Sequence, residues 1–159
     1  MAEQSADERQ VAIQRIYVKD ISFESPRAPA VFAEKWEPDV NMQLNTRSSK
    51  LDGDDLYEVV LTVTLDTKVE GSTIFLCEVQ QAGVFVIKGF TEEEIKHVAG
   101  SFCPNQLFPY ARAAVADLVS RGGFPNLALQ PINFDALLAQ HQQELQKAQS
   151  EAQQTNERH

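Results

Sequence analysis

The feature that most constrains this chain is the stretch 74–83, which reads IFLCEVQQAG. In a β-strand, side chains alternate between two faces with a period of two. One face would carry Phe75, Cys77, Val79 and Gln81, and the other Leu76, Glu78 and Gln80. The first set suits packing against an apolar layer, whereas the second places a carboxylate beside an exposed leucine. The pattern predicts a strand with a core on one face and a docking surface on the other.

Length and composition indicate one folded domain of 159 residues, with an ordinary 43% hydrophobic content. A net charge of −9 argues against nucleic-acid binding, which needs clustered Lys and Arg, and favours basic partners or a plain solvated surface. No apolar run is long enough for membrane insertion, and the polar start of the chain predicts a cytoplasmic protein without a secretory signal.

The residue types that catalyse reactions or bind metals are scattered along the chain. Cys77 and Cys103 form no CxxC pair, and the three histidines have no metal-ligand spacing. Cysteines of this kind in a reducing compartment pack as small hydrophobic residues. The sequence also has no phosphate-binding glycine motif and no nucleophile elbow. We therefore expect no enzymatic activity, no cofactor and no metal.

Alternating segments in the first half of the chain predict an antiparallel sheet. In the segment 11–24, one face is expected to carry Ile13, Tyr17, Ile21 and Phe23, and the other Asp20, Ser22 and Glu24. Asp20 and Glu24 would lie about 13 Å apart along a strand, so they form an acidic stripe rather than a proton-sharing pair. Further strands are expected at 39–46 and 57–66, and a turn at 70–72 predicts a hairpin with the strand that contains 74–83.

The second half of the chain is expected to be helical. Thr91 and Glu94 match a capping box, and Gly100 is expected to end this short helix. A second helix is predicted from Phe108 to Arg121, and Asn133 caps a third. This order of elements predicts an α+β fold, a four-stranded antiparallel sheet followed by helices packed on one face.

The expected domain runs from residue 11 to residue 141. Residues 1–10 are predicted to be a flexible N-terminal arm, and residues 142–159 a flexible, Gln-rich C-terminal tail in which a frayed helix is also possible. Trp36 and Met42 can belong either to the core or to an apolar groove. The proline-punctuated stretch 124–132 has the same two interpretations, and its residues alone favour the core.

Six segments spread over nearly the whole chain carry a family resemblance. They are IQRIYVKDISFE (13–24), YEVVLTV (57–63), FLCEVQQAGVF (75–85), CPNQLFPYAR (103–112), VSRGGFP (119–125) and LQPINFDALL (129–138). In this combination they resemble the SecB family of bacterial protein-export chaperones. The resemblance implies an ATP-independent holdase that binds unfolded preproteins in apolar grooves, keeps them translocation-competent and delivers them to the motor ATPase SecA. It also implies a homotetramer, a dimer of dimers with helices between two eight-stranded sheets.

The resemblance also implies roles for particular residues. The zinc-bearing C-terminal segment of SecA is expected to bind the outer face of the sheet at Asp20, Glu24, Leu76 and Glu78. Positions that sustain the tetramer match Cys77, Val79 and Gln81. The candidates for the preprotein groove are Trp36, Met42, Leu44, Phe124, Leu127 and Ile132.

Other functions stay open from the sequence. The main alternative is a general cytosolic antifolding chaperone, for example one associated with a toxin–antitoxin pair, that has another delivery partner. An enzyme and a purely structural oligomer are further alternatives. The acidic face that the resemblance assigns to SecA favours the export role.

Overall fold

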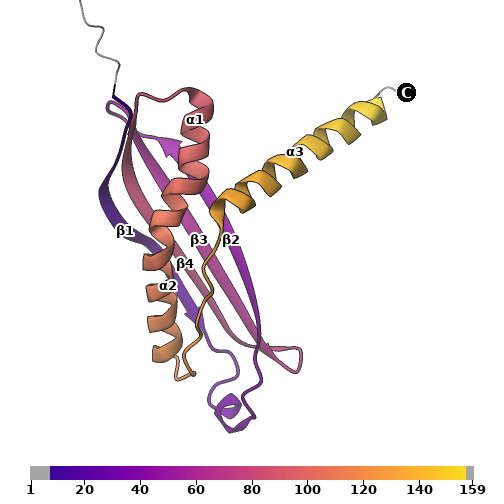
Figure 1. Cartoon of the computed structure of the whole chain (residues 1–159). Helices are drawn as coiled ribbons and strands as arrows, with labels where there is room; N and C mark the ends of the chain where they lie inside the picture. Colours follow the sequence, from indigo (N-terminus) through magenta and orange to yellow (C-terminus); the bar gives the residue numbers. More distant parts are fainter. Residues whose placement is uncertain (1–7, 157–159) are drawn as a thin grey trace, which may run out of the picture.

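The computed structural model describes residues 8–156 and contains one antiparallel sheet with helices against one face (Figure 1). The strands follow the order β1-β4-β3-β2 across the sheet, so the predicted four-stranded antiparallel sheet is confirmed. Their bounds are Gln10–Glu24 for β1, Asp39–Lys50 for β2, Leu56–Val69 for β3 and Ser72–Lys88 for β4, and a 3-10 turn, η1, covers Ala30–Ala33.

The hairpin between β3 and β4 is closed by a turn whose two central residues, Glu70 and Gly71, have φ angles of 50° and 78°. Two positive φ values in succession are typical of the two-residue turn whose twist matches that of the flanking strands. The hairpin expected at 70–72 is therefore confirmed.

The helices are joined more closely than the sequence predicts. α1 (Glu92–His97) continues through a π-helical turn, η2 (Val98–Phe102), into α2 (Cys103–Arg121). The expectations that Gly100 ends a helix and that the next one begins at Phe108 are therefore wrong. Gly100 stays inside the helical run because its missing Cβ leaves room for Leu138, whose Cδ1 atom would lie 2.9 Å from such a Cβ.

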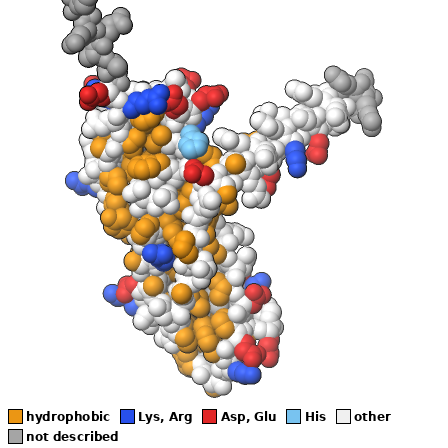
Figure 2. Space-filling view, viewed as in Figure 1, with side chains coloured by type: hydrophobic (Ala, Val, Ile, Leu, Met, Phe, Trp, Pro, Cys, Tyr) orange, Lys and Arg blue, Asp and Glu red, His pale blue; other side chains and the backbone are white. Residues whose placement is uncertain are grey.

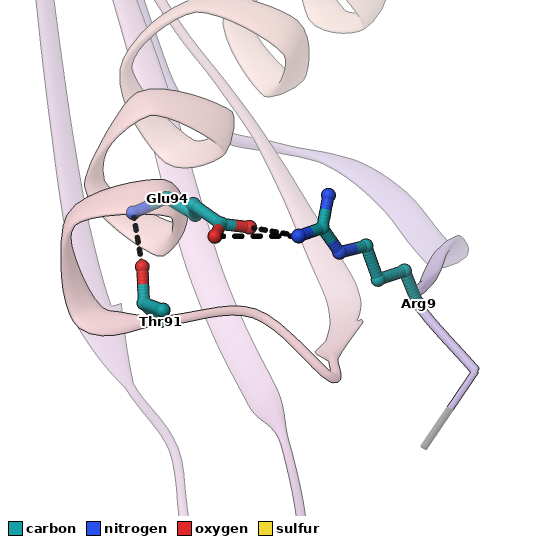
Figure 3. A network of polar contacts seen from close by, with 3 residues as sticks. All are labelled: Arg9, Thr91 and Glu94. Carbon is teal, nitrogen blue, oxygen red and sulfur yellow. Dashed lines mark hydrogen bonds and ion pairs between the residues drawn. The ribbon is translucent and has the colours of Figure 1, made fainter. Parts of the chain in front are cut away.

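The start of α1 follows the predicted cap in part (Figure 3). The side chain of Thr91 accepts a hydrogen bond from the backbone N–H of Glu94, at 3.3 Å. The carboxylate of Glu94 does not complete a reciprocal capping box but pairs with Arg9, whose Nη2 atom lies 3.4 Å from Glu94 Oε2. This pair connects the chain just before β1 to the first turn of α1.

α2 packs on one face of the sheet, called here the inner face, and the opposite face is called the outer face (Figure 1). The core between α2 and the sheet is mostly apolar, with Thr67 and Gln81 as buried polar residues on the inner face of the sheet. Its fully buried members include Leu61, Val63, Leu65, Phe75, Cys77, Val79, Leu107, Ala111 and Val115. Figure 2 shows hydrophobic side chains gathered over α2 and the strands beside it, with most charged side chains toward the margins of this view.

α3 (Phe134–Asn156) begins against η2 and then projects away from the body of the molecule (Figure 1). The predicted tail 142–159 is thus helical as far as Asn156, and its last three residues lie outside the described part. Most of the predicted arm 1–10 also lies outside it, and β1 begins at Gln10. The flexibility expected of both ends stays a prediction.

β1 departs from regular pairing at two places. Its register with β4 shifts between Ile13 and Arg15 and again between Val18 and Asp20. Such bulges insert one extra residue and reverse the alternation of faces beyond it. Tyr17 is therefore not on the inner face with Ile21, as the simple alternation predicts, but on the outer face with Asp20, where its hydroxyl donates a hydrogen bond to Glu58 of β3.

Candidate functional site

An acidic surface lies on the outer face where β1 pairs with β4. It consists of Asp20, Glu24, Leu76 and Glu78, the four residues that the resemblance assigns to SecA. The register places Glu24 opposite Leu76 and Ser22 opposite Glu78, so these side chains share one face of two neighbouring strands. Leu76 is 38% exposed at the Glu24 end of this row, and Asp20, which pairs with Gln80, lies at the other end. The structure thus places all four residues in one row on the outer face, with an apolar contact at one end of the carboxylates.

The carboxylates of the acidic surface are only lightly engaged. Glu78 accepts a hydrogen bond from the Thr64 hydroxyl at 3.1 Å, which leaves its other oxygen free. Within residues 8–156, none of Asp20, Glu24 and Glu78 forms an ion pair. Exposed, unpaired carboxylates attract a cationic partner and set its association rate and salt dependence more than its affinity.

A second polar group lies on the outer face beside the acidic surface. Lys19 Nζ lies 2.7 Å from Glu58 Oε1, and the Tyr17 hydroxyl donates to the other oxygen of the same carboxylate. The hydrogen bond from Lys19 lowers the pKa of Glu58. Burial, followed by the contact with Glu58, raises the pKa of Tyr17 to about 12. Glu58 is therefore ionised and Tyr17 is protonated at neutral pH.

The three residues that the resemblance assigns to the tetramer lie within the protomer. Cys77 and Val79 are fully buried in the core under α2, and Gln81 is 3% exposed. The Gln81 side-chain amide donates to the backbone carbonyl of Tyr17 at 3.1 Å, next to the second bulge of β1. In this structure their side chains support α2 and the edge strand, so any effect on assembly would pass through those elements.

Sequence reasoning missed the exposure of the apolar residues on the inner face of β1. Ile13, Val18 and Ile21 pair in register with Phe85, Gln81 and Val79, which places them on the inner face. Val18 is 47% and Ile21 is 43% exposed, because β1 is the edge strand beyond the reach of α2. Ile21 was predicted to lie on this face. Val18 lies there because the first bulge, between Ile13 and Arg15, reverses the alternation of faces. Their apolar identity was visible in the sequence, whereas their lack of cover was not.

An apolar groove of about 730 Å³ runs between β2, η2 and the start of α3. Met42 and Leu44 line it from the inner face of β2, and Ile132 closes one side. Sequence reasoning missed Leu137 and Leu138 of α3 as further members of the wall. A smaller hollow of about 640 Å³ lies on the other side of the turn 131–134. The groove therefore has apolar walls at these residues, whereas the smaller hollow is also lined by Asp135, which accepts a hydrogen bond from Ser101 and lies 3.8 Å from His97 Nε2.

The remaining groove candidates lie elsewhere. Phe124 is 6% exposed and contacts the rings of Phe23, Phe32, Trp36 and Phe75, with the Phe75 centroid 4.9 Å away. We call these five residues the aromatic cluster. The structure does not bring Trp36 and Phe124 together with the groove.

The stretch 124–132 joins the aromatic cluster to the apolar groove. Leu127 and Ile132 are partly buried against the core, which agrees with the core interpretation of this stretch. Leu127 thus lies between the two sites and lines neither hollow.

The described residues offer little for covalent or metal chemistry. Burial raises the pKa of Cys77 to about 11 and that of Cys103 to about 12, so both thiols are protonated and unreactive at neutral pH. Within residues 8–156, no group of three or more His, Cys, Asp or Glu side chains is placed to hold a metal ion. No helix in the same range has the length and apolar character to cross a membrane.

The family model for SecB, described as the preprotein translocase subunit SecB, matches residues 4–145. The chain belongs to the SecB family. The fold is also similar to that of a SecB-like chaperone from Mycobacterium tuberculosis, solved with a ChAD peptide from the HigA1 antitoxin, with a TM-score of 0.64 at 20% identity over 77% of this chain and 90% of that one. A protein of unknown function from Streptococcus agalactiae matches more distantly, with a TM-score of 0.39 at 12% identity over 77% of this chain and 98% of that one.

Proposed function

We propose that this SecB-family protein is an ATP-independent holdase that binds unfolded preproteins in its apolar groove and hands them to SecA through its acidic surface. Membership of the SecB family and the fold shared with a SecB-like chaperone support the chaperone role. The observation that carries the two-step proposal is the separation of two surfaces of different chemistry. A row of carboxylates with Leu76 at one end lies on the outer face, and an apolar groove lies beside the inner face.

The groove has the properties that a binder of many unfolded sequences needs. Its walls at Met42, Leu44 and Leu137 offer apolar area rather than a fixed set of hydrogen-bond partners. Methionine in particular adapts its shape to different ligands. At roughly 25 cal/mol per Å², burying a few hundred Å² of a bound segment gives several kcal/mol before the ordering costs. Affinity without sequence readout is the expected result.

The acidic surface suits a cationic, partly apolar segment. We propose that the zinc-bearing C-terminal segment of SecA places basic groups near Asp20, Glu24 and Glu78, and an apolar group on Leu76. Contacts at an exposed rim favour fast, salt-sensitive association, which suits a transient hand-over. The carboxylates belong to two strands that are hydrogen-bonded to each other, so the backbone positions that carry them are set before the partner arrives.

We further propose assembly into a homotetramer, a dimer of dimers. The support is the uncovered apolar row of Ile13, Val18 and Ile21 on the inner face of an edge strand. An edge strand with exposed apolar side chains is usually covered by another part of the protein or by a partner, because an uncovered one pairs with other chains. A second subunit would cover this row and place several grooves on one particle, and several grooves would raise the avidity for a long client.

A simultaneous-binding experiment tests the proposal. A labelled C-terminal segment of SecA is titrated with the protein, alone and saturated with a denatured preprotein, and its fluorescence anisotropy is followed. Because the two surfaces are separate, we expect the affinity for the SecA segment to change less than twofold when the client is bound. Displacement of the SecA segment by the client, or no binding of the segment at all, would contradict the proposal.

A second candidate function is control of an antitoxin rather than export. The shared fold with a chaperone whose structure contains an antitoxin peptide favours it, since the same groove could accept such a segment. Cells that express the protein distinguish the two functions. Co-purification of preproteins in a SecA-dependent manner supports export, and co-purification of an antitoxin regardless of SecA supports the alternative.

A further inference from the structure

The second bulge of β1 places two residues of opposite charge side by side on the outer face. Val18 pairs with Gln81 and Asp20 pairs with Gln80, so Lys19 is the extra residue of the bulge. The Lys19 ammonium contacts Glu58 on the outer face. Asp20 lies on the same face, opposite Gln80. A cation is thus adjacent in sequence to a carboxylate of the acidic surface.

The side chain of Lys19 is directed away from that surface. Glu58 lies on β3 in the row of Val84, whereas the acidic surface extends in the opposite direction along β4, toward Glu78. Lys19 Nζ is 2.7 Å from Glu58, and the Glu58 side chain is only 18% exposed, so the ammonium is held across the sheet. The Tyr17 hydroxyl occupies the other oxygen of the same carboxylate.

Without Glu58, the long flexible stem of Lys19 would let its ammonium pair with the neighbouring Asp20. Arg47, the other cation that acts on Glu58, belongs to β2 on the far side of β3 and is remote from the acidic surface. Lys19 is therefore the cation whose position decides whether Asp20 is available to a partner.

We propose that Glu58 is a positioning residue that holds Lys19 away from Asp20 and so keeps the acidic surface open to a cationic partner segment. The choice of partner rests on the proposed function, but the placement of Lys19 does not. Glu58 lies outside the acidic surface, and the one charged residue of β1 that it contacts is Lys19, across the intervening strand β4.

Crystal structures and binding titrations of three variants test this inference. In Glu58→Gln, we expect Lys19 Nζ within pairing distance of the Asp20 carboxylate and about two- to fivefold weaker binding of the SecA C-terminal segment, with a shallower salt dependence. In the double variant with Lys19→Gln and Glu58→Gln, no ammonium remains to occupy Asp20, so the affinity should return to at least the wild-type value.

Two controls separate this role from others. Tyr17→Phe keeps the Lys19–Glu58 pair but removes one hydrogen bond of the network, so it should bind as the wild type does. Glu93→Gln, on the exposed surface of α1, makes the same change in net charge far from the outer face and should also bind normally.

Three results would overturn the inference. These are a Glu58→Gln structure in which Lys19 stays away from Asp20, a double variant that binds as weakly as Glu58→Gln, and a Tyr17→Phe variant that is equally weak. If the wild type does not bind the SecA segment, the proposed partner is refuted. The position of Lys19 in the Glu58→Gln crystals then still decides this inference.

Discussion

Glu58 has a measurable signature at the scale of single residues, because its contacts depend on pH. Lys19 and then Tyr17 lower its pKa, so its contribution to stability is present above its unfolded-state pKa and is lost as the pH falls through the lower folded value. For Tyr17 the sign is opposite. Its pKa is raised to about 12, so its contribution is present below its usual value near 10 and is lost as the pH rises through about 12.

We predict that Glu58→Gln lowers the free energy of unfolding by about 1 kcal/mol at neutral pH, because one charged contact is partly exposed to solvent. The difference from the wild type should shrink as the pH is lowered through the folded pKa of Glu58, where the carboxylate is neutralised in the wild type as well. Urea unfolding at about pH 7 and about pH 3 measures it. An equal difference at both pH values would show that the network does not depend on the carboxylate charge.

Phe124 is predicted to act chiefly through stability. It lies at the centre of the aromatic cluster, so Phe124→Ala should cost about 3–5 kcal/mol of unfolding free energy. Phe32→Ala is the matched control, since Phe32 contacts the same ring but is 52% exposed, and it should cost much less. Equal losses in urea unfolding would contradict the central position of Phe124.

At the same scale, the sequence predicts which residues of β4 face the core, because strict alternation leaves one arrangement that buries Phe75, Cys77 and Val79. The same alternation fails for Tyr17, because no particular residue type marks a bulge in the sequence, and a bulge reverses the faces of the residues beyond it. The sequence also groups Trp36 and Phe124 with Met42, since apolar side chains do not reveal which hollow they line.

At the scale of elements, the contact between η2 and α3 sets the width of the apolar groove. Gly100 of η2 lies against Leu138, and the Ser101 hydroxyl donates to Asp135 in the first turn of α3. The ring of Phe134 also lies against that of Phe108 in α2. α3 is therefore held to the body by its first turns, and the wall that it adds to the groove depends on η2.

We predict that Gly100→Ala displaces the Leu138 side chain in the wall of the groove and so changes client affinity. The new Cβ would lie 2.9 Å from Leu138 Cδ1, which is closer than such contacts allow, so the leucine side chain, which lines the groove, must shift. We expect a severalfold change in the affinity for a denatured preprotein and an unchanged affinity for the SecA segment. Adding Leu138→Ala removes the clash, and failure of that double variant to move back toward wild-type affinity would count against the mechanism.

The sequence predicts the strands better than the helix boundaries. The hairpin is marked by turn-forming residues at Glu70 and Gly71, and in the four strands apolar and polar side chains alternate. In contrast, Gly100 and Pro109 are ordinary helix breakers, yet the helical run continues through both. At Gly100 the glycine is needed because α3 approaches closely there. This is a tertiary contact, and local helix propensity does not reflect it.

At the scale of the whole molecule, the proposed assembly depends on the inner face of β1. We predict that Val18→Lys lowers the mass of the native particle, because it places a charge in the apolar row that a second subunit would cover. Ser22→Lys is the matched control, since it adds the same charge to the outer face of the same strand. Light scattering coupled to size exclusion measures both masses.

An unchanged mass for Val18→Lys would show that the inner face of β1 is not an assembly surface. Substituting Val79 is a less selective test of the tetramer. That residue is fully buried, so an arginine there would unfold the protomer as well as any assembly. The choice between the two positions could be made only from the structure, because the sequence shows that both are apolar but not which one is covered.

The central claim is that one sheet carries two independent sites, an acidic surface for the motor and an apolar groove for clients. The most direct test is calorimetric titration of Glu78→Lys and Leu44→Asp with two ligands, the SecA C-terminal segment and a denatured preprotein. We expect Glu78→Lys to bind the SecA segment at least tenfold more weakly and the preprotein normally, and Leu44→Asp to show the reverse. Loss of both affinities in either folded variant, or of neither, would contradict the account.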